Sequence, residues 1–181
     1  MGSIIKVNEY KDFGNNAIMT SDGSGNVTVN AGGLKNTPAF HVSKSLANQS
    51  LSDDTNTKLT FDTELFDSDN NFASNKFTPT TAGKYCLYAQ VYLANDNPDI
   101  GLIEMSFYKN GSQVAFHQHD HRTEMVGYNQ IPNIMTIVEA NGSSDYFEVY
   151  AKADVSSASD LRVFGTSDGY TYFNGYKLIG A

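Results

Sequence analysis

The sequence predicts an all-β protein, a β-sandwich or jelly roll with a small N-terminal β-segment. Three observations lead to this fold class. Apolar and polar residues alternate with a period of two in many short runs, turn-forming Asn-Gly and Gly-rich segments separate these runs, and no stretch has the length and period of an amphipathic helix. Eight or more short strands joined by short turns are typical of sandwiches and jelly rolls.

The composition supports one domain with a small appendage. The chain has 181 residues, of which 40% are hydrophobic, enough for one full core but not for two. Only 18% of the residues are charged, which is typical of an all-β surface protein rich in Asn, Ser, Thr, Gly and Tyr. The net charge of −8 opposes binding to nucleic acids and anionic membranes, because both attract cationic surfaces.

No membrane insertion is expected. No apolar run approaches the length of a membrane helix, and residues 1–15 contain no apolar region of the signal-peptide type.

Residues 1–35 are expected to form a β-rich attachment segment, and residues 36–181 the head. Three short β-prone runs in the first segment are separated by Gly14-Asn15-Asn16 and by the Asp-Gly-Ser-Gly-Asn turn at 22–26. Three such strands carry too little apolar mass to fold alone, so they must pack against another surface. Ala31-Gly32-Gly33 is typical of a hinge. The sequence leaves open whether the segment packs on its own subunit or on a neighbour.

The head is expected to consist of strands from Pro38 onward. Asn110-Gly111 is the strongest hairpin signal, because a two-residue turn with positive φ at both positions suits Asn and Gly. Asn141-Gly142-Ser143-Ser144 is a second tight connection. The expected strands are 38–45, 57–66, 84–94, 100–109, 112–121, 134–139, 145–152, 161–164 and 170–179.

Two of these strands have informative faces. In strand 57–66, Leu59, Phe61 and Leu65 alternate with polar residues, which predicts one buried and one exposed face. Strand 84–94 is apolar or aromatic on both faces, so we expect it to be covered twice. Its two faces are Tyr85, Leu87, Ala89, Val91, Leu93 and Cys86, Tyr88, Gln90, Tyr92.

The stretch from 61 to 88 resembles the signature of the complement C1q globular-head family, relatives of the tumour necrosis factor fold. The matching residues are Phe61, Asp67, Phe72, Phe77, Gly83 and Tyr85. FYKNGSQV at 107–114 and YTYFNGYKL at 170–178 resemble the same family, so the resemblance covers about residues 37–181. It implies a jelly-roll head that assembles as a homotrimer and recognises other molecules without catalysis.

A second resemblance covers residues 7–28, which are similar to openings of structural proteins of tailed bacteriophages. It implies a virion component, either a fibre knob or a decoration protein of the capsid or tail, on the surface of the particle. Residues 1–35 would bind other virion proteins, and loops such as 96–100 or 120–132 would meet a host-surface glycan or protein. The alternative is a soluble C1q-like recognition module, lectin-like or adhesin, of a cellular organism.

Three histidines form the first candidate metal site. His117, His119 and His121 alternate on one strand, so their side chains project from one face. At a three-fold axis they could chelate Zn²⁺ or Ni²⁺ or act as a proton switch. No carboxylate or cysteine at metal spacing accompanies them, and an exposed strand end is the favoured interpretation.

The loop after strand 84–94 is a weaker candidate, for calcium. Asp96, Asn97 and Asp99 offer oxygens, but Ca²⁺ needs six or more ligands, and a solvated turn is favoured. We therefore predict no metal and no cofactor.

No catalytic residue is predicted, and we expect that the protein is not an enzyme. Asp62, Glu64, Asp67 and Asp69 could hold a pair of carboxylates for glycoside hydrolysis, but their alternation is typical of the exposed face of a strand. No nucleophile elbow, phosphate loop, dinucleotide fingerprint or zinc-protease motif is present. Cys86, the single cysteine, is expected to be a small buried hydrophobic residue.

Tyrosines mark a candidate contact surface. They fall on predicted strands, several of them opposite the expected core residues, and tyrosine is typical of half-buried contact surfaces. Such a surface would be a subunit interface or a sugar-stacking face, and the doubly covered strand 84–94 favours the interface. The tyrosines are Tyr85, Tyr88, Tyr92, Tyr146, Tyr150, Tyr170, Tyr172 and Tyr176.

Overall fold

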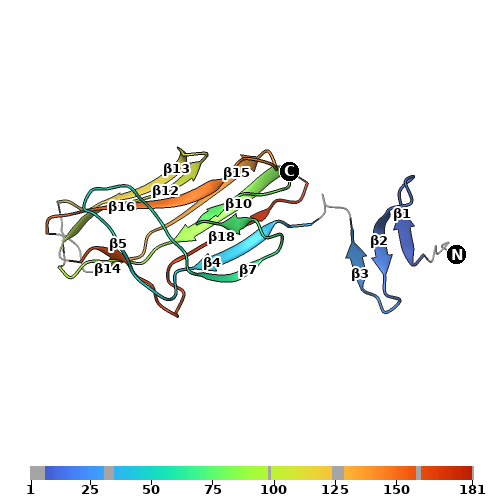
Figure 1. Cartoon of the computed structure of the whole chain (residues 1–181), viewed down its shortest axis with the longest axis horizontal. Coiled ribbons are helices and arrows are strands. Elements are labelled where there is room, and N and C mark those ends of the chain that lie inside the picture. Colours follow the sequence, from blue (N-terminus) through green and yellow to red (C-terminus); the bar gives the residue numbers. More distant parts are fainter. Residues whose placement is uncertain (1–6, 31–34, 98, 124–128, 158–159, 181) are drawn as a thin grey trace.

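The computed structural model describes residues 7–30, 35–97, 99–123, 129–157 and 160–180, and in these ranges the protein is all-β, as predicted (Figure 1). Two large antiparallel sheets form a jelly-roll sandwich. Among the described residues no helix has the length and apolarity needed to cross a bilayer.

One layer of the sandwich is a five-stranded sheet. Its strands, in spatial order, are β15 (Asn133–Ala140), β10 (Gly83–Gln90), β18 (Tyr172–Lys177), β4 (Ala39–Ser43) and β7 (Thr63–Asp67). The other layer runs β13 (Ser112–Asp120), β12 (Ile100–Lys109), β16 (Phe147–Val155), β9 (Lys76–Phe77) and β8 (Phe72–Ala73), and β6 (Thr57–Lys58) also pairs with β16. A smaller sheet contains β14 (Asn129–Gln130), β11 (Leu93–Ala94), β17 (Arg162–Val163) and β5 (Gln49–Ser50).

The core lies between the two large sheets and is rich in phenylalanine. Phe40 of β4 stacks on Phe77 of β9 with ring centroids 4.3 Å apart, and it meets Phe173 of β18 edge-on at 4.8 Å. All three rings are fully buried. The Phe40–Phe77 contact joins the two layers, and the Phe40–Phe173 contact joins neighbouring strands of one layer.

The residues that carry the C1q-like spacing have structural roles. The Asp67 carboxylate accepts a hydrogen bond from the Phe72 backbone amide at 2.6 Å, which ties the edge of one sheet to the edge of the other. The hydroxyl of the buried Tyr85 donates a hydrogen bond to the Thr81 carbonyl at 2.6 Å. These two hydrogen bonds give Asp67 and Tyr85 of the spacing a role in folding.

Strand 57–66 differs from the prediction. It is two strands in different layers, β6 in the six-stranded sheet and β7 in the five-stranded sheet, and the chain crosses between the sheets at 59–62. Leu59 is buried, as expected, but Leu65 is 59% exposed. The crossing and a register shift beside His41 change which side of the chain meets the core, so the alternation could not be extended through it.

Other predicted features are confirmed. Strand 84–94 is divided into β10 and β11, yet its inward face, from Tyr85 to Leu93, is completely buried throughout. At the hairpin between β12 and β13, Asn110 and Gly111 have φ values of 53° and 81°, the conformation that this dipeptide favours.

The N-terminal β-segment is a three-stranded antiparallel sheet of β1 (Glu9–Lys11), β2 (Ala17–Ser21) and β3 (Val27–Val29), which lies apart from the sandwich in Figure 1. None of residues 7–30 is buried. This agrees with the expectation that the segment has no core of its own. The predicted hinge at 31–33 lies outside the described residues.

Candidate functional site

The main candidate contact surface is the outer face of the five-stranded sheet. We call it the aromatic face. Cross-strand register places Met135, Tyr88, Asn174, His41 and Phe66 in one row across all five strands. The aromatic face consists of His41, Phe66, Tyr88, Met135, Ile137, Tyr172 and Tyr176, all of which are half-buried or exposed.

The rings of this face stack in a continuous strip. Tyr172 lies between Tyr88 and His41, with ring centroids 5.6 and 5.3 Å away and interplanar angles of 27° and 21°. Phe66 extends the strip to the sheet edge, 6.3 Å from His41. At the opposite edge Met135 and Ile137 are 67% and 61% exposed. An apolar strip of this extent on a sheet is typical of an interaction surface.

Burial shifts the pKa values of groups in this strip. Burial lowers the pKa of His41, which favours its neutral form. Burial, together with a hydrogen bond to Tyr88, raises the pKa of Tyr172 to about 12. The centre of the aromatic face is therefore uncharged near neutral pH.

Cys86 lies at the aromatic face, whereas the sequence predicted that it would be buried in the core. It is half-buried on the outer side of β10 and not in the core. Interaction with Cys86, electrostatic and by hydrogen bonding, raises the pKa of the neighbouring Tyr176 hydroxyl. The strand alternation placed Cys86 opposite Tyr85 correctly, but the prediction assumed that this second face was also buried.

The predicted tyrosine surface is divided. Tyr85 belongs to the core. Tyr92 and Tyr170 pack together, 5.6 Å apart, and Tyr150 packs on Tyr108, 4.2 Å away, on the outer side of the six-stranded sheet. Lys76 lies over the ring of Tyr146. Only Tyr88, Tyr172 and Tyr176 contribute to the aromatic face.

Sequence reasoning missed the apolar and imidazole members of this face. His41 and Phe66 adjoin the tyrosines only through the pairing of β18 with β4 and of β4 with β7. Met135 and Ile137 carried a usable signal, because β15 has apolar residues on both of its faces, as strand 84–94 does.

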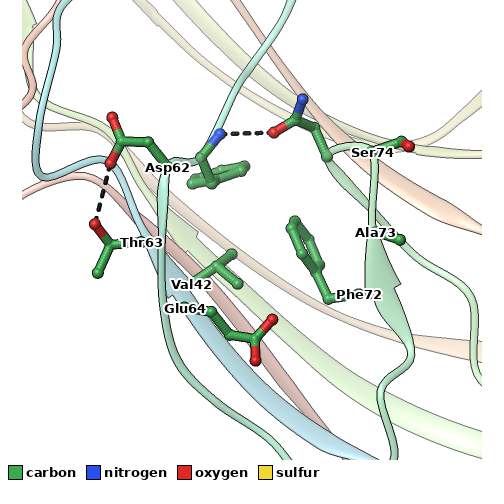
Figure 2. A pocket seen from close by; sticks show the side chains of 9 residues that line it. Val42, Asp62, Thr63, Glu64, Phe72, Ala73 and Ser74 are labelled. Carbon is green, nitrogen blue, oxygen red and sulfur yellow. Dashed lines mark hydrogen bonds between the residues drawn. The ribbon is translucent and has the colours of Figure 1, made fainter.

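A surface pocket of about 340 Å³ lies between the edge strands β7 and β8 of the two sheets. Figure 2 shows the Phe72 ring and the Glu64 carboxylate directed into the space between these strands. Its lining residues are Val42, Phe61, Asp62, Thr63, Glu64, Phe72, Ala73, Ser74 and Asn75. An aromatic wall with a few polar groups around it is a typical small-ligand site.

Asp62 of this pocket is engaged by its own protein. Its carboxylate accepts hydrogen bonds from the backbone amides of Ser45, Leu46 and Ala47, the shortest at 2.7 Å, and lies 3.9 Å from the buried ammonium of Lys44. Burial opposes ionisation of Asp62, but the backbone hydrogen bonds and Lys44 outweigh it and lower the pKa. Asp62 is therefore an ionised structural clamp, unsuited to act as a general acid.

The acidic run 62–69 is not one exposed strand face, in contrast to the prediction. Asp67 caps Phe72, and Asp69 is hydrogen-bonded to Ser68. Within the described part of the chain, the Glu64 side chain alone of the four forms no hydrogen bond or ion pair, and it faces the pocket. The register shift between β4 and β7 contributes to the difference, because it places both Glu64 and Asp67 opposite buried residues of β4, Val42 and Phe40.

The two carboxylates of the candidate calcium loop are engaged by other residues of the protein. The Asp99 carboxylate accepts hydrogen bonds from Asn95 at 2.7 Å and Ser156 at 3.0 Å, and Asp96 pairs with Arg162 at 3.0 Å. The Asn97 amide donates to Ser157. The other proposed contact loop, 120–132, includes residues 124–128, which lie outside the described residues.

His117 and His119 share one side of β13, as predicted, whereas β13 ends at Asp120 and His121 follows the strand. The Nε2 atoms of His117 and His119 are 2.6 Å apart, and the ring of His121 lies 5.8 Å from that of His119. Among the described residues no three His, Cys, Asp or Glu side chains are arranged to hold a metal ion together.

Comparison with known proteins shows the fold. No family profile matches the sequence, and no curated protein is significantly similar to it. Crystal structures of murine APRIL at pH 5.0, 8.5 and 8.0 match with TM-scores of 0.55, 0.51 and 0.52 and sequence identities of 13%, 14% and 13%. Each match covers 77% of this chain and 98% of that chain. The head thus has a jelly-roll fold like that of tumour necrosis factor.

Proposed function

We propose that this protein is a homotrimeric, non-enzymatic recognition head of a tailed-phage virion, attached to the particle through residues 1–35. The observation that carries the trimer is the aromatic face. It spans a whole sheet, and its centre contains stacked rings without a formal charge. Removing such a surface from water stabilises an assembly by about 25 cal/mol per Å² of apolar area.

A second copy of the chain is the best occupant of this face. Formal charges on the outer side of β10 and β15 lie at one end, where Lys84 and Glu139 are paired across the strands. An interface with an apolar centre and charges at its rim has the composition of subunit contacts. In a closed ring of three copies, the aromatic face of each subunit would be covered by a neighbouring subunit.

The ligand would bind in the pocket between β7 and β8. Phe72 provides an aromatic wall, and Glu64 and the side-chain amide of Asn75 provide polar groups for hydroxyl recognition. The Asn75 side chain is held in place, because its Oδ1 accepts a hydrogen bond from the Phe61 backbone amide at 2.8 Å. We propose a sugar unit of a host-surface glycan as the ligand, and three such weak sites would act together through multivalency.

The virion assignment is supported by the resemblance of residues 7–28 to openings of phage structural proteins. It is also supported by the absence of buried residues between 7 and 30, because such a sheet needs a partner surface. The alternative is a soluble C1q-like recognition module of a cellular organism, with the same head. Mass spectrometry of purified phage particles distinguishes the two: finding the chain in stoichiometric amount supports the virion role, and its absence contradicts it.

Light scattering tests the trimer. The full chain should have three times the monomer mass of 19.8 kDa. Tyr88→Arg places a charge at the centre of the aromatic face and should give monomers. The matched variant Tyr150→Arg alters a half-buried tyrosine on the outer side of the other sheet and should leave the trimer intact. A wild-type monomer, or equal effects of both variants, would contradict the proposal.

Glycan binding tests the pocket. Glu64→Gln should weaken binding of the host polysaccharide at least about tenfold, since hydrogen bonds to charged groups contribute about 1.5–3 kcal/mol. The mass of the assembly should not change. If the protein instead cleaves the polysaccharide and Glu64→Gln abolishes the cleavage, the non-enzymatic assignment is wrong.

A further inference from the structure

Two histidine side chains on the edge strand β13 are in direct contact through their ring nitrogens. The Nε2 atoms of His117 and His119 are 2.6 Å apart, with ring centroids at 4.5 Å. We propose that this pair is a binding site for a divalent transition-metal ion of the Zn²⁺, Ni²⁺ and Cu²⁺ class. The site is independent of the proposed recognition function.

The strand backbone fixes the spacing of the two rings. Residues at i and i+2 of a strand lie on the same side, and β13 is paired along its length with β12, where His117 lies opposite Met105 and His119 opposite Ile103. Both histidines are exposed, so their rings can adjust and water can reach them. Two nitrogens that bind one tetrahedral ion at about 2.0–2.1 Å are about 3.3 Å apart, so the rings need to separate by well under 1 Å.

The chemistry of the donors selects the ion. Neutral imidazole is a good ligand for Zn²⁺, Ni²⁺ and Cu²⁺ and a poor one for Mg²⁺ and Ca²⁺, which prefer oxygen. At present one Nε2 donates a hydrogen bond to the other. For both lone pairs to face the ion, that donor must move its proton from Nε2 to Nδ1, and no net proton is released from two neutral rings.

No protein group competes for the pair. Neither His117 nor His119 forms an ion pair with any described residue, and the neighbouring Asp120 carboxylate is bound to Arg122 at 2.9 Å. Since no three potential ligands converge in the described part of the chain, water molecules would complete the coordination. His121, 5.8 Å from His119, lies beside the site and is not a ligand in this arrangement.

Calorimetric titration of the full chain with ZnCl₂ tests the proposal. We expect one ion per chain, and His117→Ala and His119→Ala should each weaken binding at least about tenfold, because loss of even an outer-shell partner costs about 10–100-fold. Gln118→Ala, an exposed change on the same strand but on its other side, should leave the affinity unchanged. Titration with CuCl₂ should give tighter binding than with ZnCl₂, and MgCl₂ should give none.

The proposal is overturned if neither ZnCl₂ nor CuCl₂ gives a heat of binding at millimolar concentration, or if the two histidine variants bind as tightly as the wild type. It is also overturned if Gln118→Ala loses as much affinity as His117→Ala. Circular dichroism of each variant establishes that it is folded. A tenfold loss in His121→Ala as well would also contradict the two-histidine site, because it would assign three ligands.

Discussion

The imidazole ring of His41 stacks on the phenol ring of Tyr172, with centroids 5.3 Å apart and planes inclined by 21°. The contact joins β4 to β18 at the centre of the aromatic face. His41 is flanked there by Phe66 and Asn174 and has no ion pair with any described residue. Its charged form is therefore disfavoured, and burial lowers its pKa from the ordinary value of 6.5.

Stability should consequently depend on pH through His41. Its pKa is lower in the folded state than in the unfolded state, so the unfolded state binds more protons. The stabilisation is complete above about pH 6.5 and is lost as the pH falls through the folded-state value. Urea unfolding at about pH 7.5 and pH 5.5 should show a lower free energy of unfolding at the lower pH. The difference should shrink in His41→Gln, and an unchanged difference would refute the assignment.

Asp62 should be important for stability and not only for the pocket. Asp62→Ala removes the acceptor of three backbone amides at 45–47 and the partner of the buried Lys44. We expect a loss of about 1–3 kcal/mol in the free energy of unfolding, measured by urea denaturation. Glu64→Ala, a change at a carboxylate of the same pocket without a partner among the described residues, should cost less than about 0.5 kcal/mol. Similar losses in both variants would mean that the clamp contributes little.

Gly175 should tolerate no side chain. A Cβ atom there would lie 2.6 Å from Leu87 Cδ2 and 3.0 Å from both the Cys86 carbonyl and the Phe40 ring. Gly175→Ala should therefore cost about 1–3 kcal/mol through overpacking. In the matched variant Gly101→Ala, the nearest atom is the flexible Arg122 side chain at 3.0 Å, and the loss should be smaller. Chemical denaturation of both variants gives the comparison, and a larger loss in Gly101→Ala would contradict it.

The head should fold without residues 1–35. Among the described residues, the hydrogen bonds of residues 8–30 lie within that segment, including those of Asp12 with Asn16 and of Asp22 with Asn26. A chain beginning at Asn36 should therefore have a Tm within about 2 °C of the full chain, the shift expected from a change of about 0.5 kcal/mol. Differential scanning calorimetry measures it. A large decrease in Tm would mean that the segment packs on the head.

Part of the candidate site could be predicted from sequence. Strand alternation correctly placed Tyr88 on the outer side of β10, and it placed His117 and His119 on one side of β13. These are local relationships, because a strand's side chains alternate whatever the strand pairs with. His41 and Phe66 could not be assigned in this way, because they join the aromatic face only through the pairing of β4 with its two neighbours.

The sequence by itself determined the all-β class, most of the strands and the hairpin at Asn110-Gly111, because these follow from side-chain alternation and from the backbone preferences of single residues. Tertiary structure alone decided that strand 57–66 is divided between two sheets, that Leu65 is exposed, and that Glu64 meets Phe72 across a pocket. The physical reason is that the side of a strand that becomes buried depends on which distant strands it pairs with and which sheet covers it.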